Sequence, residues 1–234
     1  MPRFSLGGRL ASLMCGDIAV MAGGKWCRVY LLAGIFLMAE CVAGQTSGDS
    51  RLDIVHVGDG VQRTLDALGG IYRYQPFETD RTPATAENVV EGAVYFFKRK
   101  VGSLEASGVV TFGGGKVTAF AIAAVSPELN SGHVGRLLRE LHLALGMPDR
   151  FGVVQCTNLK GPRDAPAAFW TKGDVTHAVG WIAEANGPGW IEFKSIKKGT
   201  TEDEAPLFPV NPTSPTERDA ITERGMREYQ GAVR

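Results

Sequence analysis

The stretch LHLALGMPDRFGVV, residues 141–154, runs from an apolar helical pattern through a turn into an apolar strand-like pattern. Apolar residues from Val134 to Leu145 recur at the spacing of one helix face. Gly146 can end this helix, because glycine adopts the left-handed backbone common after helices, and Pro148 lies just beyond it. The stretch therefore predicts a helix that stops at Gly146 and is followed by a strand.

A similar stretch, LDALGG at residues 65–70, ends an earlier helical pattern. In both patterns a glycine stands eleven residues before the final one: Gly58 precedes Gly69, and Gly135 precedes Gly146. An internal duplication would explain this agreement. The chance agreement of two short motifs is the alternative.

Strand-like runs rich in β-branched and aromatic residues follow both helical patterns, at residues 93–97, 108–112, 116–124, 151–156, 167–171, 175–183 and 189–196. Three glycines, Gly113 to Gly115, join two of these runs and are typical of a hairpin turn, without the spacing of a phosphate loop. We therefore predict an α+β fold with two helix-plus-antiparallel-sheet units, residues 45–128 and residues 129–198.

Two further segments have a polar composition. Residues 72–92 are rich in Pro, Thr and Glu and predict a long loop, which in a compact domain is usually functional or mobile. Residues 199–234 have little apolar content and predict a disordered tail, since they bury too little surface to offset the ordering entropy. Within the tail, residues 215–230 could form a short exposed helix.

Residues 1–44 have the three parts of a secretory signal peptide. Lys25 and Arg28 supply positive charge, residues 29–39 form a short apolar run, and small residues follow at 43–44. The apolar run is about half of the ~20 residues that a transmembrane helix needs. We predict export to the periplasm or the medium, with an uncleaved N-terminal anchor as the alternative.

Cysteine usage raises the question of a lipid anchor. Cys41 follows the apolar run, but Glu40 occupies the position where a bacterial lipidation site needs a small residue. Lipidation of Cys41 stays an alternative to a cleaved signal. Cys156 is the one cysteine beyond the leader, so it cannot form an internal disulfide. Its apolar strand-like context predicts a buried, unreactive thiol.

The aromatic residues are the best candidates for a binding surface. Trp170, Trp181 and Trp190 all come from the strand runs of the second unit. They can build the core or, where exposed, form an aromatic face of the kind that anchors protein interfaces. Tyr72 and Tyr74, at the start of the long loop, are added to this candidate set.

No catalytic or metal-ligating pattern is present, so we predict no metal and no cofactor. A hydrolase would need His133, His142 or His177 to meet a carboxylate such as Glu184 or Glu192 in a cleft. The other interpretation of these carboxylates is solvent-facing charge. The 25 basic and 25 acidic residues cancel, which gives no support for nucleic-acid binding.

Two motifs carry a family resemblance: the segment Gly135 to Pro148, with its Leu-Gly-x-Pro end, and the hairpin FGGGKV, residues 112–117. They resemble the SmpA/OmlA-type small outer-membrane lipoprotein family of the β-barrel assembly machinery. Two units in tandem would be similar to the architecture of secreted β-lactamase inhibitor proteins. The resemblance implies an α+β fold and an exported, partner-binding, non-enzymatic role.

These observations predict an exported, non-catalytic binding module of the bacterial envelope or secreted space. Its expected partner is a protein, bound through the sheet and the 72–92 loop. Contact with a membrane is expected only through an uncleaved or lipidated N-terminus. The alternatives are an envelope hydrolase of unknown substrate and a lipid-anchored envelope assembly factor.

Overall fold

The computed structural model describes residues 51–73, 83–158, 161–183, 188–199 and 214–234. The expected signal peptide, with Cys41, lies outside the described residues, as does Tyr74. No helix in the described ranges is long and apolar enough to cross a membrane.

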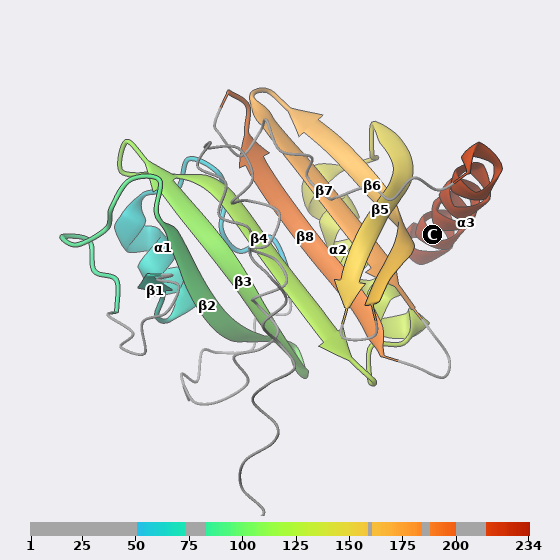
Figure 1. Cartoon of the computed structure of the whole chain (residues 1–234), viewed down its shortest axis with the longest axis horizontal. Helices are drawn as coiled ribbons and strands as arrows, with labels where there is room; N and C mark the ends of the chain where they lie inside the picture. The colour runs from blue at the N-terminus through green and yellow to red at the C-terminus, as the bar shows by residue number, and fades with distance from the viewer. Residues whose placement is uncertain (1–50, 74–82, 159–160, 184–187, 200–213) are drawn as a thin grey trace, which may run out of the picture.

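Within the described chain, eight strands form one antiparallel sheet in the order β1-β2-β3-β4-β8-β7-β6-β5 (Figure 1). The strands are β1 (Tyr72–Arg73), β2 (Val94–Val101), β3 (Leu104–Gly113), β4 (Lys116–Ser126), β5 (Arg150–Asn158), β6 (Gly161–Lys172), β7 (Val175–Ile182) and β8 (Gly189–Lys197). The helices are α1 (Val61–Leu68), α2 (Ser131–Leu145) and α3 (Pro215–Val233). The predicted α+β class with antiparallel strands is confirmed.

Two successive segments of the chain form the two halves of the sheet. The first half consists of α1 followed by β1–β4, and the second half consists of α2 followed by β5–β8. The last strand of each half pairs with that of the other, from Ala119 opposite Ile196 to Ser126 opposite Gly189. The two expected units therefore share a single continuous sheet.

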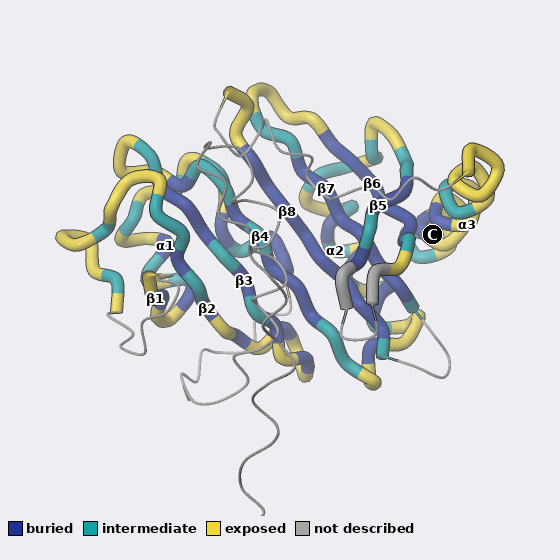
Figure 2. Tube along the Cα trace, viewed as in Figure 1, coloured by how far each residue is buried: buried dark blue, intermediate teal, exposed yellow. Residues whose placement is uncertain are grey.

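The three helices of the described chain pack on one face of this sheet, where they enclose the main core (Figures 1 and 2). Strand side chains alternate between faces, so every second residue of each strand points into this core. The core includes Tyr95, Phe97, Phe120, Ile122, Trp170, Val179, Trp181 and Phe193 from the strands, and Leu68, Leu137, Leu138, Leu141 and Tyr229 from the helices. We call the opposite side the helix-free face, a term that covers the described residues only.

Helix α2 forms as its sequence predicts. Asn130 caps its start, because the side-chain Oδ1 accepts hydrogen bonds from the backbone N–H of Gly132 at 3.0 Å and of His133 at 3.1 Å. At the other end Gly146 has a positive φ of 77°. Strand β5 then begins at Arg150. The helix–stop–strand prediction for this stretch is confirmed.

The prediction of a disordered tail is wrong for residues 214–234. These residues include α3, a helix of 19 residues, which packs on α2, β5 and β6. Its start is defined by Pro215 in the first turn and by Ser214, whose Oγ accepts a hydrogen bond from Glu217 N at 3.4 Å. The helix considered at residues 215–230 is present, but it is packed on the second half instead of lying exposed in a disordered tail. Average composition did not reveal this packing, because the fully buried Tyr229 provides most of the large apolar contact of α3.

The expected loop over residues 72–92 is wrong at its start. Tyr72 and Arg73 form the edge strand β1, in which Tyr72 lies opposite Phe96 of β2. Tyr72 also forms an isolated antiparallel bridge to Pro83. Residues 74–82 lie outside the described part of the chain.

Candidate functional site

The three candidate tryptophans are core residues. Trp170 and Trp181 lie on the helix-bearing face and are fully buried, while Trp190 lies on the opposite face and is 2% exposed. The indole N–H of Trp170 donates to the carbonyl of Gly146 at 2.9 Å. The core interpretation therefore holds for all three, and they form no exposed aromatic surface.

The structure separates Tyr72 from the candidate tryptophans. Tyr72 is half-buried on β1, at the first-half edge of the sheet. Trp170, on β6, lies six strands away in the sheet order. A single aromatic site that combines these two residues is excluded by this arrangement.

The helix-free face is organised in rows that cross the strands. One row, defined by the strand register, runs through Phe96, Val109, Ala121, Lys194, Ala178 and Phe169. The next row runs through Lys98, Ser107, Ala123, Glu192, Gly180 and Ala167. Both rows have alanine or glycine on each side of a charged residue in β8.

An ion pair lies at the centre of these rows. Lys194 Nζ is 3.2 Å from Glu192 Oε1, and both side chains are less than a tenth exposed. Burial lowers the pKa of Lys194 below its ordinary value, and the neighbouring Glu192 carboxylate opposes this effect. The expectation that Glu192 is a solvent-facing charge is wrong.

Burial changes from one side of this ion pair to the other. On the first-half side, Phe96, Val109 and Ala121 are half-buried. On the second-half side, Ala178 and Phe169 are buried. The accessible part of the helix-free face therefore lies over β2–β4, strands along which Figure 2 shows stretches of intermediate burial. The Glu192–Lys194 pair, on β8 beside β4, lies along its inner border.

The second-half side is closed by a small core of its own. Trp190 packs there with Val154, Cys156, Ala165, Ala167, Phe169, Ala178 and Ile182. Cys156 is fully buried, and burial together with the Glu192 carboxylate raises the pKa of its thiol to about 12. The thiol is therefore protonated at neutral pH, and the predicted burial of this cysteine is confirmed.

Of the two carboxylates that the hydrolase hypothesis named, Glu192 is in the described part of the chain, and no histidine contact with it is found there. His177 shares a hydrogen bond of 2.9 Å with Ser195 Oγ, and both residues are buried on the helix-bearing face. Glu192 points to the other face, because it is separated from Ser195 by an odd number of positions on β8. His142 contacts the Tyr229 hydroxyl, and Glu184 lies outside the described residues.

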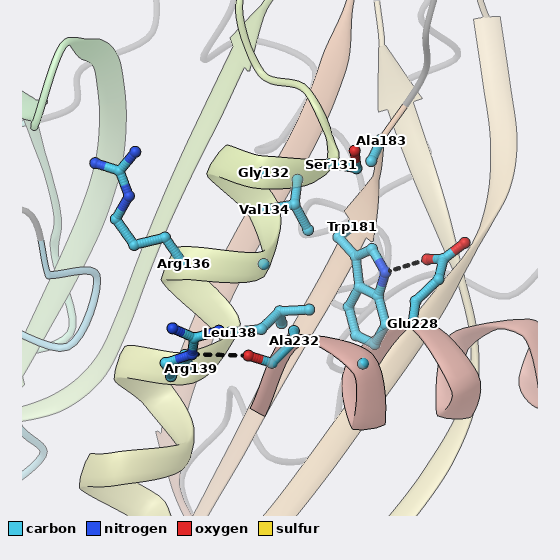
Figure 3. A pocket seen from close by; sticks show the side chains of 12 residues that line it. Ser131, Gly132, Val134, Arg136, Leu138, Arg139, Trp181, Ala183, Glu228 and Ala232 are labelled. Carbon is cyan, nitrogen blue, oxygen red and sulfur yellow. Dashed lines mark hydrogen bonds between the residues drawn. The ribbon is translucent and has the colours of Figure 1, made fainter. Parts of the chain in front are cut away.

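An open hollow of about 560 Å³ lies between the start of α2 and the end of α3 (Figure 3). Val134, Leu138 and Trp181 form its apolar side. Two contacts hold the end of α3 beside it: Trp181 Nε1 donates to Glu228 Oε2 at 2.7 Å, and Arg139 Nε donates to the carbonyl of Ala232 at 2.8 Å. The hollow therefore depends on the position of α3.

Among the described residues, no group of His, Cys, Asp and Glu is arranged to hold a metal ion. Comparison of the chain with protein-family models, with curated protein sequences and with solved structures gave no match.

Proposed function

We propose that the protein is an exported, non-catalytic binding module of the bacterial envelope or secreted space, and that it binds a protein partner on the helix-free face over β2–β4. The observation that carries this proposal is the asymmetry of the sheet. In the described chain, the helices cover one face throughout, whereas the other face is closed over the second half and half-buried over the first.

The composition of this surface supports a protein partner. Phe96 and Val109 supply apolar contact area, and Lys98 and Lys100 supply exposed positive charge along β2. An apolar centre with a polar rim is the usual anatomy of a protein interface. The alanines of β4 beside the Glu192–Lys194 pair have short side chains, so they do not hold a partner away from the sheet. A bound partner would therefore cover the ion pair completely.

Site-specific photo-crosslinking tests the surface. A photoreactive amino acid at Val109, in cells that produce the protein, is expected to yield a discrete adduct with one partner. The matched control is the same amino acid at Leu143, which is 79% exposed on α2 and lies on the helix side. Equal adduct patterns at both positions, or no adduct at Val109, would reject the proposed face.

Export is tested separately by the intact mass and N-terminal sequence of the mature protein. A chain that starts at Gly44 or Gln45 supports the exported module. A chain that starts at a diacylated Cys41 supports the alternative of a lipid-anchored assembly factor. A chain that keeps residues 1–44 supports an uncleaved anchor.

We also propose that the two halves arose by internal duplication. Their shared order of one helix and four strands supports this, as does the Leu-Gly stop that ends both α1 and α2. Pairing of the two last strands, β4 with β8, is the arrangement expected when a two-fold relation joins two such units.

A hydrolase remains the second candidate because Ser195 and His177 share a hydrogen bond, as a nucleophile and its general base would. A fluorophosphonate probe tests this directly. Labelling of the folded protein that disappears in Ser195→Ala would favour a hydrolase. The binding-module proposal expects no labelling, because Ser195 is only 1% exposed.

A further inference from the structure

Helix α3 packs on α2, β5 and β6 of the second half, and we call the surface that these three elements present to it the seat. Residues 200–213 lie in the chain between β8 and α3. The seat is therefore formed by one part of the chain and filled by a helix from its C-terminal end.

Tyr229 is the anchor in this seat. Its ring lies within 5.4–6.2 Å of the rings of Phe151, His142 and Trp170. Its hydroxyl is 3.2 Å from His142 Nδ1 and donates to the carbonyl of Gly146 at 3.5 Å. A buried aromatic ring with a bonded polar tip is a typical interface anchor.

Two further contacts make the seat selective. A Cβ atom at Gly225 would lie 2.3 Å from Pro166 Cβ, so only glycine allows this approach of α3 to β6. One turn further along, Glu228 accepts a hydrogen bond from Trp181. The seat thus recognises a helix with glycine, glutamate and tyrosine at fixed spacing.

The contact of α3 with the seat is concentrated in a few residues. Gly225 and Tyr229 are its buried residues, and much of its remaining surface is polar or charged. The vacated seat, in contrast, would expose Trp170 and Phe151 to water. The occupant that best restores this contact is a second helix of the same sequence.

We propose that the seat also accepts α3 of a second copy of the chain, so that two copies pair by reciprocal exchange of their C-terminal helices. Residues 200–213 span roughly 45–50 Å when fully extended, which exceeds the roughly 28 Å length of α3. Such exchange needs no new interface, because each seat receives an identical helix.

Exchange would leave the helix-free face open in both copies. A pair would then present this face twice, which increases avidity for a repeated partner. The pairing does not depend on the function proposed above, and its test uses no partner protein.

The geometry offers a direct test by cysteine crosslinking. A Cβ at Gly135 of α2 would lie 3.6 Å from Ala232 Cβ of α3, within the range of a disulfide. One full-length copy carries Gly135→Cys and the other carries Ala232→Cys, with Cys15, Cys27 and Cys41 replaced by serine in both. Cys156 is fully buried and stays.

Neither copy can form this bridge within itself, so a disulfide between positions 135 and 232 requires α3 of one copy in the seat of the other. We expect this hetero-crosslink on oxidation of the mixture, with a yield that rises with concentration. Its absence, while both copies are folded by circular dichroism, would overturn the proposal.

Two matched variants of the Ala232→Cys copy complete the design. Tyr229→Ala is expected to lower the crosslink by about thirtyfold or more, as for loss of a hot-spot anchor. Gln230→Ala, at an exposed neighbouring position, is expected to change it less than about twofold. A crosslink that survives Tyr229→Ala would show pairing through another surface and would contradict exchange.

A chain carrying both cysteines gives the positive control, because it must form the internal disulfide if α3 is seated as described. Light scattering of the unmodified chain measures its oligomeric state independently, without any substitution. A mixture of monomer and dimer is expected, and a purely monomeric chain at its highest soluble concentration would also contradict exchange.

Discussion

The two halves of the sheet share one order of elements but are covered differently. In the first half, α1 has 8 residues and β1 has two, and the helix-free face is half-buried. In the second half, α2 has 15 residues, α3 adds a second helix, and the helix-free face is closed around Trp190. Equal topology therefore gives one half that is sealed on both faces and one with an accessible face.

Side-chain size in the strands explains the difference. Gly180 on β7 allows the Trp190 ring to lie across the sheet, since a Cβ there would be 2.7 Å from the ring and from Val154. In the first half, the same row of the helix-free face carries Ser107 and the exposed Lys98. Among the described residues, no tryptophan lies on β2 or β3 to close this face as Trp190 does in the second half.

The largest expected effect is on the stability of the closed half. Trp190→Ala should lower the free energy of unfolding by about 3–5 kcal/mol, because it removes a buried ring and leaves a cavity. Phe96→Ala, at a half-buried position on the same face, should cost about 1 kcal/mol. Equilibrium urea unfolding measures both. Equal losses would mean that the first-half face is closed as well.

The Glu192–Lys194 ion pair, which lies between the accessible and the closed parts of the helix-free face, gives the second prediction. Lys194→Met alone should cost about 3 kcal/mol, because it leaves the Glu192 carboxylate buried without its partner. The double variant Lys194→Met/Glu192→Leu should recover most of this loss. A double-mutant cycle in urea measures the coupling. Additive losses would show that the two charges act independently and that the border is solvated.

The third prediction concerns His177, a buried histidine on β7 of the second half. Burial, and next the charge of His56, lower its pKa from 6.5 to about 4, while Asp53 and Lys172 act in opposite directions. Between these values the unfolded chain binds a proton that the folded chain does not. Stability present at neutral pH is therefore lost as the pH falls from about 6.5 to about 4, by about 2–3 kcal/mol.

His177→Gln should flatten this pH dependence, because glutamine cannot bind the proton, and it can still bond to Ser195. Urea unfolding of the unmodified chain and of His177→Gln from pH 4 to pH 7 measures the difference in slope. An unchanged slope in His177→Gln would assign the acid sensitivity to other groups.

The sequence predicted α2, its stop at Gly146 and most strands, because helical and strand periodicities are local properties of the chain. It gave residues 215–230 as a short exposed helix within a disordered tail but did not predict the burial of Tyr229, whose partners lie far away: His142 precedes it by 87 residues. No local pattern reports a contact of that kind. Tertiary packing of Tyr229 orders residues 215–233 as a helix although their average composition is polar.

The candidate site was predictable only in part. Alternation places Glu192 and Lys194 on one face of a strand, which could have indicated a pair. Their burial could not be inferred, because it depends on Ala and Gly residues of neighbouring strands. The same holds for the tryptophans, since a strand that is buried on both faces gives no contrast between them.

The smallest expected effect tests how α3 joins the second half. Gly225→Ala should cost about 2 kcal/mol, because the new methyl group would meet Pro166 and push α3 from its seat. Gly231→Ala, where no atom lies within 4 Å of the added Cβ, should stabilise the helix by roughly 0.5–1 kcal/mol. Hydrogen exchange of α3 amides measures this local effect separately from global unfolding. Faster exchange in Gly225→Ala and slower exchange in Gly231→Ala would show that close approach to β6, and not helix propensity, limits the seating of α3. Equal behaviour of the two variants would mean that α3 adds little cover to the second half, and the contrast between the halves would then rest on the Trp190 cluster alone.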